Sequence, residues 1–246
     1  MRHVAILGMS FCGSTVLSYV LGVLPGCATI GESHWLADPH PATGKPLGCM
    51  RCKSSCPVIT DELRARLRTG PWYPTIADAL GAEILISSDK SPEHIERFAP
   101  ARDYDAIVLF RHPARQLASH ARVFGEPGGA FDDASWLSGW RRFYGRLLYA
   151  FALAGRTRFV CFDDFAAAPE PVLADLAGWL GVAFDAAALE YWRLPHHVVG
   201  GNFNPFACNR LDPARLPIRP REAPAGTVDA ASLALFAALN ATCRGR

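Results

Sequence analysis

The chain has 246 residues, of which 50% are hydrophobic and 20% are charged, and its formal net charge at pH 7 is +2. This length suits one large α/β domain, and the apolar content is ample for a core. The mild charge argues against nucleic acid as a partner, and no run approaches the ~20 apolar residues of a membrane span.

The first 28 residues are basic and then apolar, an order that is also found in secretory signal peptides. Glycine and hydroxyl residues interrupt the apolar run, however, and residues 3–8 have the pattern of a strand that enters a loop. We therefore expect this segment to be part of the fold. We also expect a cytoplasmic protein that keeps most of its eight cysteines reduced.

Five apolar segments of strand length follow one another along the chain, and they are rich in β-branched residues. Each is continuous rather than alternating, which is the pattern of parallel strands covered on both faces. The predicted strands are residues 3–8, 28–32, 83–88, 105–111 and 158–164.

Amphipathic segments alternate with these strands and predict helices. They cover residues 14–24, 113–124, 136–155, 170–181 and 228–241. The alternation favours a doubly wound parallel β-sheet flanked by helices, in a single domain over residues 1–246. Two stretches are predicted to be irregular: a Cys-rich inserted loop at 37–60 and a lid-like segment at 195–227.

The first loop, GMSFCGST at residues 8–15, lies between the first strand and the first helix. Its glycines have the spacing of a phosphate-binding loop, in which backbone N–H groups and a helix N-terminus hold an anion. Ser14 stands where such loops carry the lysine that grips a γ-phosphate. The loop is therefore predicted to bind a different phosphate, the alternative being a chance βα turn.

A second anion site is predicted in the segment VLFRHPARQLASH. Arg111 ends the fourth strand, and Ser119 lies on the following helix. Ligands of open parallel sheets bind beyond the carboxyl ends of the strands, so Arg111 is expected at the same edge as the glycine loop. An arginine holds a phosphate through two N–H groups, and the serine hydroxyl can close its far side. The alternative is a structural ion pair for Arg111, with Ser119 on a solvated face.

Together with the later segment DDFAAAPEPVLADLAGWLG, these two features resemble the PAPS-dependent sulfotransferase family over about residues 3–181. PAPS is 3′-phosphoadenosine 5′-phosphosulfate. The resemblance implies a P-loop NTPase-like fold and transfer of a sulfuryl group to a hydroxyl or amine of a small-molecule or carbohydrate acceptor. It implies PAPS as co-substrate, 3′-phosphoadenosine 5′-phosphate (PAP) as product, and no required metal.

The same resemblance assigns the donor site. Arg111 and Ser119 would hold the 3′-phosphate, and the loop would face the 5′ end through Ser10, Phe11, Cys12, Gly13, Ser14 and Thr15. In HHVVGGNFNP, residues 196–205, the resemblance points to a segment that closes over the adenosine, through Gly200, Gly201, Asn202 and Arg210. The alternative for that segment is an ordinary turn.

Family loops usually carry a Lys or Arg where this chain has Phe11, although bacterial relatives with S-x-S-G-S-T loops share the replacement. Lys90, one of three lysines in the chain, is the predicted substitute, the alternative being an exposed salt-bridge lysine. Similar D-K-x-P stretches contact the sulfate side in tyrosylprotein-type and bacterial relatives.

Glu32 follows the second strand and resembles the catalytic glutamate of tyrosylprotein-type enzymes, so it is favoured as general base. His34 is the competing base, because a histidine ordinarily titrates near neutral pH. The remaining alternative for Glu32 is a structural carboxylate that caps a loop.

The inserted loop carries Cys49, Cys52 and Cys56 in a C-x2-C-x3-C pattern. Three states stay open: free thiols, a disulfide of the kind that family relatives carry in this insertion, or a structural zinc site. Candidates for a fourth zinc ligand are Cys27, His34, His40 and Cys208. The aromatic residues along 136–155 are expected to pack in the core, with part of them lining an apolar acceptor pocket.

Two other functions compete with sulfuryl transfer. A P-loop kinase or triphosphatase would use Asp89 or Asp163 to hold magnesium, but the missing loop lysine counts against it. The second competing function is that of a nucleotide- or partner-binding protein without transfer activity. Phe11 supports it, because this residue replaces the family's usual loop cation.

Overall fold

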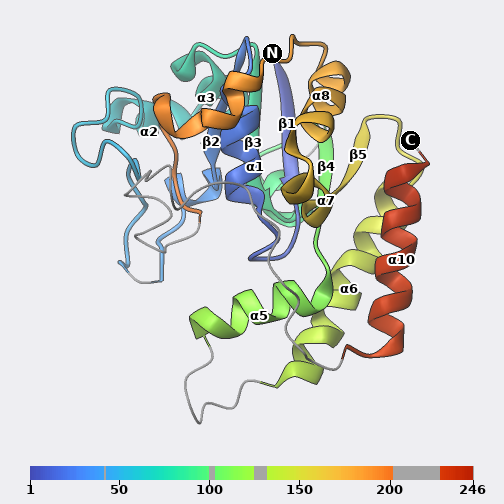
Figure 1. Cartoon of the computed structure of the whole chain (residues 1–246). Coiled ribbons are helices and arrows are strands. Elements are labelled where there is room, and N and C mark those ends of the chain that lie inside the picture. Colours follow the sequence, from blue (N-terminus) through green and yellow to red (C-terminus); the bar gives the residue numbers. More distant parts are fainter. Residues whose placement is uncertain (42, 100–102, 125–131, 202–227, 246) are drawn as a thin grey trace.

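The computed structural model describes residues 1–41, 43–99, 103–124, 132–201 and 228–245. Within them, one parallel sheet has the strand order β2-β3-β1-β4-β5 and helices on both faces (Figure 1). The strands are β1 (Arg2–Leu7), β2 (Cys27–Gly31), β3 (Ile84–Lys90), β4 (Asp105–Phe110) and β5 (Thr157–Cys161). The predicted doubly wound parallel sheet is thereby confirmed.

The helices that the sequence pattern predicts are present; α5 has the predicted bounds, and the others have shifted ends. They are α1 (Ser14–Leu21), α5 (Pro113–Phe124), α6 (Asp133–Phe151), α8 (Pro169–Leu180) and α10 (Ala230–Arg244). The structure adds shorter helical segments: η1 (Ser33–Leu36), α2 (Asp61–Leu67), α3 (Trp72–Leu80), α4 (Pro92–Glu96), α7 (Phe162–Ala167) and η2 (Ala186–Arg193). The periodicity of such short helices is hard to distinguish from that of a loop.

Local chemistry explains where the predicted elements end. The fifth strand stops at Cys161 rather than at 164, because Asp163 and Asp164 form the first turn of α7, where acidic side chains are favoured. Helix α6 begins earlier than predicted, because the Asp132 side chain caps it by accepting the N–H groups of Ala134 and Ser135.

The apolar residues of the strands alternate between two cores, one on each face of the sheet. One core joins Ala5 and Leu7 of β1 to α2, α3, α6 and α10. The other joins Val4 and Ile6 to α1, α8 and η2. Helices therefore cover both faces, which explains why the strands lack alternating polar residues.

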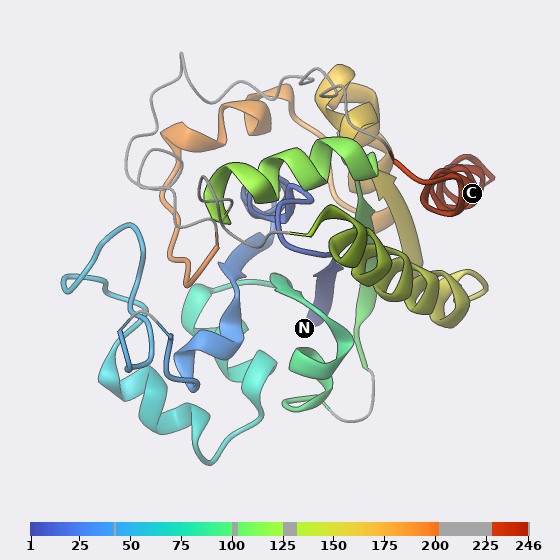
Figure 2. The ribbon, with the colours of Figure 1, turned by 90° about the horizontal axis from the view of Figure 1, so that it is seen from below.

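The strand order places the connections after β1 and β4 on opposite faces of the sheet. Helix α1 follows β1 on one face, whereas α6 follows β4 on the other, and β1 and β4 are neighbours. The carboxyl edge of such a strand pair is where open α/β sheets bind ligands. Helix α5 lies across this edge, as the views from the side and from below both show (Figures 1 and 2).

Outside the sheet layers, the described residues of the inserted loop 37–60 form turns and an isolated bridge between Cys49 and Lys53. Helix α10 packs against α6 and β5. Among the described residues, no helix combines the length and the apolar character that crossing a bilayer requires.

Candidate functional site

The glycine loop, residues 8–15, joins the end of β1 to the start of α1. At one position of this loop the backbone conformation requires glycine. Gly13 has a φ of +102°, and a Cβ atom there would lie 2.2 Å from the ring of Phe162. Phe11 also adopts a positive φ, of 66°, although it is not glycine. The loop is thus folded tightly around the N-terminus of α1, the geometry that exposes backbone N–H groups to an anion.

Buried side chains from α5 and α6 hold the backbone of this loop. The Gln116 side-chain amide donates to the carbonyl oxygens of Met9 (3.2 Å) and Ser10 (2.9 Å), and the Trp140 indole N–H donates to the Gln116 oxygen (3.0 Å). The Tyr144 hydroxyl accepts the Met9 N–H (3.2 Å) and donates to the Leu109 carbonyl. Trp140 and Tyr144 are fully buried, so part of the predicted aromatic core also positions the loop.

The side chains of the loop differ in their surroundings. Cys12 and Ser14 are buried, whereas Ser10 is exposed. Burial raises the pKa of the Cys12 thiol, and the nearby positive charge of Lys90 offsets part of that rise. The ring of Phe11 stands edge-on to His120, with 5.6 Å between the ring centroids.

The second predicted anion site brings Arg111 and Ser119 into direct contact. The guanidinium group of Arg111 donates to the Ser119 hydroxyl at 3.2 Å, and both residues are buried, at 5% and 6% exposure. The guanidinium carbon also lies 5.4 Å from the centroid of the Phe162 ring, in a cation–π contact. Because Phe162 is the residue that packs against Gly13, it connects the arginine site to the glycine loop.

Asp163 orients Arg111, a role that the sequence pattern does not indicate. Its carboxylate pairs with Arg111 (3.4 Å) and Arg115 (3.0 Å) and accepts the His112 N–H (2.8 Å). Two guanidinium groups thus meet one carboxylate at the end of β4. Arginine side chains gathered in this way can bind an anion through several N–H groups.

Glu32 and Lys90 form an ion pair at the carboxyl ends of β2 and β3. The other carboxylate oxygen of Glu32 accepts the Trp35 indole N–H at 3.0 Å, and only 5% of Glu32 is exposed. Lys90 has a positive φ of 68°, and its carbonyl oxygen accepts the Gly8 N–H at 2.8 Å. The backbone of Lys90 therefore binds the glycine loop directly, while its side chain turns to Glu32.

A buried network centred on Asp89 fixes the two turns that carry this ion pair. The Asp89 carboxylate accepts bonds from the Ser33 hydroxyl (2.8 Å), the His34 backbone N–H (3.0 Å) and the His34 imidazole (3.0 Å). Burial would raise the pKa of Asp89, but the hydrogen bonds from His34 outweigh it and keep that pKa below its usual value. The imidazole of His34 is thus directed at Asp89, beside the turn rather than within the ion pair.

The described start of the lid-like segment lies against both the ion pair and the glycine loop. The Val199 carbonyl accepts the Glu32 N–H at 2.8 Å, extending the sheet beyond β2. Gly200 has a φ of +65°, and a Cβ there would lie 2.7 Å from the Trp35 ring; a Cβ on Gly201 would lie 3.3 Å from the Thr15 hydroxyl. Asn202 and Arg210 lie outside the described residues.

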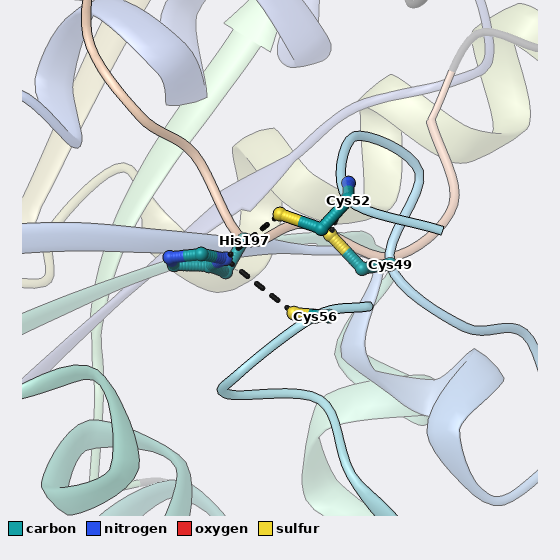
Figure 3. A group of neighbouring side chains, drawn as sticks. All are labelled: Cys49, Cys52, Cys56 and His197. Atoms are coloured by element: carbon teal, nitrogen blue, oxygen red, sulfur yellow. Dashed lines mark hydrogen bonds between the residues drawn. The ribbon is translucent and has the colours of Figure 1, made fainter. Parts of the chain in front are cut away.

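The cysteines of the inserted loop gather with a histidine that the sequence did not point to. Cys49, Cys52, Cys56 and His197 place one ligand atom each within 4.8 Å of one another (Figure 3). Cys27, His34 and His40 are not part of this group, and Cys208 lies outside the described residues. The cysteines that the structure describes, including these three, are free of disulfides.

The thiols of this group differ in their readiness to ionise. Burial works against ionisation of Cys49, but the N–H groups of Cys52 and Arg51 bond to its sulfur and lower its pKa. Burial and the neighbouring Cys49 raise the pKa of Cys52 to about 11. Burial lowers the pKa of His197, which favours a neutral imidazole.

Sequence reasoning missed several of these residues for a common reason. Gln116, Trp140 and Tyr144 hold the loop through contacts between elements distant in sequence. The signal that could have found Gln116 is its position, one polar amide on the helix that also carries Ser119. His197 could have been considered because it lies at the start of the predicted closing segment, residues 196–205.

Comparison with known proteins gives relatives at the level of structure. No protein-family model matches the chain, and no curated protein sequence matches it. The sulfotransferase domain of the Synechococcus PCC 7002 olefin synthase is similar, with a TM-score of 0.64 and 20% identity over 98% of this chain and 94% of that one. A sulfotransferase domain from the curacin biosynthetic pathway is similar with a TM-score of 0.64 and 14% identity, over 98% of each chain. The chain therefore has the fold of sulfotransferase domains.

Proposed function

We propose that this chain is a PAPS-dependent sulfotransferase that sulfates a hydroxyl or an amine of a small-molecule or carbohydrate acceptor. The observation that carries the proposal is the buried Arg111–Ser119 contact at the end of β4, next to the glycine loop that follows β1. Two anion sites at one edge of the sheet suit a donor with phosphate groups at two ends. The fold, shared with sulfotransferase domains, supports this choice.

The donor would span the two anion sites. The backbone N–H groups of the glycine loop and the N-terminus of α1 would hold the 5′-phosphosulfate. Arg111 and Ser119 would hold the 3′-phosphate, with Arg115 adding charge and Asp163 keeping the arginines in place. Gly200 and Gly201, against Trp35 and Thr15, would offer close backbone approach at the same edge.

The reacting groups would come from the β2–β3 side. Glu32 would accept the proton of the acceptor while the acceptor oxygen or nitrogen bonds to sulfur. At the same time the bond between sulfur and the 5′-phosphate oxygen breaks, and PAP leaves with that electron pair. Lys90 lies beside Glu32 and the loop, and it would stabilise the charge on the sulfuryl oxygens. It would thereby replace the Lys or Arg that family loops carry at the position of Phe11.

His34 is the weaker candidate for the base. Its imidazole bonds to Asp89, and together with Ser33 it links the turn that carries Glu32 to the strand end that carries Lys90. We therefore assign His34 to positioning of the ion pair and keep Glu32 as the proton acceptor.

The geometry of the two aspartates weakens the kinase alternative. A magnesium ligand needs a carboxylate oxygen that can reach the ion. Asp89 is fully buried and accepts bonds from Ser33, His34 and Tyr73. Asp163 is occupied by two arginines and the His112 N–H. The alternative of a binding protein without transfer activity rests on Phe11, which stands where family loops carry a cation. Lys90 would supply that cation, so Phe11 alone does not argue against transfer.

Calorimetric titration of the full chain with PAP and, separately, with Mg-ADP tests the proposal. We expect PAP to bind and Mg-ADP to bind far more weakly. Arg111→Ala should weaken PAP binding by about 10- to 100-fold, the value of a hydrogen bond to a charged group. The control is Arg142→Ala, which removes an arginine that is exposed on α6 and should leave the PAP affinity unchanged.

Three outcomes would count against the proposal. A preference for Mg-ADP would point to the kinase function. An equal loss of PAP affinity in both arginine variants would mean that Arg111 does not contact the bound nucleotide. PAP binding without PAP formation from PAPS, across a panel of phenols, amines and sugars, would favour the binding-only protein.

A further inference from the structure

The cysteine–histidine group of the inserted loop is built from two distant parts of the chain. Cys49, Cys52 and Cys56 lie on the inserted loop, whereas His197 lies 141 positions beyond Cys56. The sulfurs of Cys52 and Cys56 are each 3.4 Å from the same nitrogen, Nδ1 of His197 (Figure 3). A ring nitrogen gathered with three cysteine sulfurs has the composition of a metal centre, because imidazole nitrogen and cysteine sulfur are the ligands that structural zinc sites use.

We propose that Cys49, Cys52, Cys56 and His197 bind one structural zinc ion. Zinc prefers four ligands drawn from cysteine sulfur and histidine nitrogen in a tetrahedron, and Cys₃His is one of its common structural sets. Sulfurs about 2.3 Å from the ion lie about 3.8 Å apart in a tetrahedron. The four ligand atoms are already within 4.8 Å of one another, so binding requires only a small contraction. Soft sulfur ligands disfavour magnesium and calcium, which take oxygen.

Backbone groups around the sulfurs form the second layer that metal sites need. The Cys52 N–H donates to the Cys49 sulfur at 3.3 Å, and the Ile59 N–H donates to the Cys56 sulfur at 3.2 Å. The tight turn after Cys49 closes through the bridge to Lys53, whose φ is 57°. N–H groups aimed at sulfur stabilise thiolates and orient them as ligands.

With all four positions taken by protein groups, the ion would be structural rather than catalytic. It would fasten the inserted loop to the chain just before residues 198–201. The Met50 N–H donates to the Val198 carbonyl at 2.8 Å, next to the group, and Val199 then bonds to Glu32. The zinc would therefore keep the 198–201 segment against Glu32, Trp35 and Thr15. This inference does not depend on the identity of the donor or the acceptor.

Metal analysis of the full chain, produced with zinc and purified without chelator, gives the first test. We expect one zinc per chain. His197→Ala and Cys52→Ala should lose the zinc, whereas His197→Cys restores four ligands and should keep it. Cys27→Ala and Cys243→Ala are matched controls, because both thiols are free and lie outside the group, and they should keep the zinc.

Cobalt substitution in the unmutated chain tests the site even if the variants fail to fold. Cobalt(II) should give the intense visible bands of a tetrahedral site and a sulfur-to-metal charge-transfer band, and zinc should abolish both. Hydrogen exchange should become faster at residues 197–201 and 30–36 after chelation, and readdition of zinc should reverse this. The proposal is wrong if the unmutated chain binds neither ion, if it holds iron instead, or if its mass shows a disulfide among these cysteines.

Discussion

At the residue scale, the charge at the glycine loop is the unusual feature. Residues 8–15 contain neither Lys nor Arg, and Phe11 directs its ring to His120. Lys90 instead approaches from the neighbouring strand in a left-handed backbone conformation, which is uncommon for a residue other than glycine. Such strain persists where the surroundings enforce it, and here the Gly8 N–H and the Glu32 carboxylate bind the two ends of Lys90.

This arrangement predicts a selective effect of Lys90→Met. The rate of PAP formation from PAPS should fall by about 10²- to 10³-fold, as when one charge-stabilising donor is removed. PAP affinity should change by less than about threefold, because PAP lacks the sulfuryl group that Lys90 would contact. Rate assays and calorimetry on the same preparations measure both quantities.

The control for this substitution is Lys45→Met, which alters an exposed lysine of the inserted loop. It should leave both the rate and the PAP affinity at the unmutated values. If Lys90→Met lost PAP affinity as strongly as rate, Lys90 would act on the nucleotide or on the fold, and its assigned role would have to be abandoned.

At the element scale, the shape of the loop depends on α5 and α6 as much as on its own glycines. Gln116 of α5 satisfies two loop carbonyls, and Trp140 of α6 holds the Gln116 amide. The Gln116 side chain is fully buried, and its loss would remove one donor from each of the two carbonyls and the acceptor of the indole N–H. The helix that lies across the carboxyl edge thus anchors the loop as well as carrying Ser119.

Gln116→Leu should therefore lower the free energy of unfolding by about 2–4 kcal/mol, because two carbonyls and an indole N–H lose a buried partner. Trp140→Phe keeps the amide and its bonds to the loop, so its hydrogen-bond loss should be smaller, about 1 kcal/mol, in addition to the loss of packing volume. Urea denaturation measures both variants.

A loss of stability alone does not show that the glycine loop is affected, so the dynamics of the loop must be measured as well. In Gln116→Leu, hydrogen exchange should rise at residues 8–13 more than in the strands. A loss below about 0.5 kcal/mol with an unchanged loop would show that water or another group replaces the amide, contrary to this account.

At the scale of the whole molecule, buried histidines make the stability depend on pH. His3 stacks on Tyr73 at 3.7 Å between ring centroids, and burial lowers its pKa from 6.5 to about 4. His196 bonds to the Tyr191 carbonyl, yet burial lowers its pKa to about 4 as well. Both imidazoles are thus neutral in the folded chain under conditions that protonate them in the unfolded chain.

The sign of the effect follows from proton binding. As the pH falls from 6.5 to 4, the unfolded chain takes up protons at these two sites that the folded chain does not, so stability falls. The loss approaches about 3 kcal/mol for each histidine near pH 4 and is absent above pH ~7.5. Urea denaturation across this range should show it.

His3→Gln and His196→Gln isolate the contribution of each site. Each variant should have a flatter dependence of unfolding free energy on pH than the unmutated chain, although its stability at pH 7.5 is lower. The remaining residues are identical in the three proteins, so the comparison isolates the substituted histidine. Parallel curves for the unmutated chain and the variants would contradict the assignment.

The sequence predicted the parts of the molecule that depend on local patterns. β-branched apolar runs identified the five strands found among the described residues, and strand ends identified the positions of Glu32, Lys90 and Arg111. What it could not predict are pairings between distant segments. His197 joins cysteines 141 and more positions away, and Gln116 meets the loop only because β1 and β4 are neighbours.

The central position of β1 divides the carboxyl edge into two halves. Arg111, Ser119 and Asp163 lie on the β4–β5 side, whereas Glu32, Lys90 and the cysteine–histidine group lie on the β2–β3 side. If the proposed function holds, adaptation to a new acceptor would change the second half while the first stays constant. In a set of diverging descendants of this chain, we expect substitutions to accumulate around residues 33–60 and to be rare around 111–119.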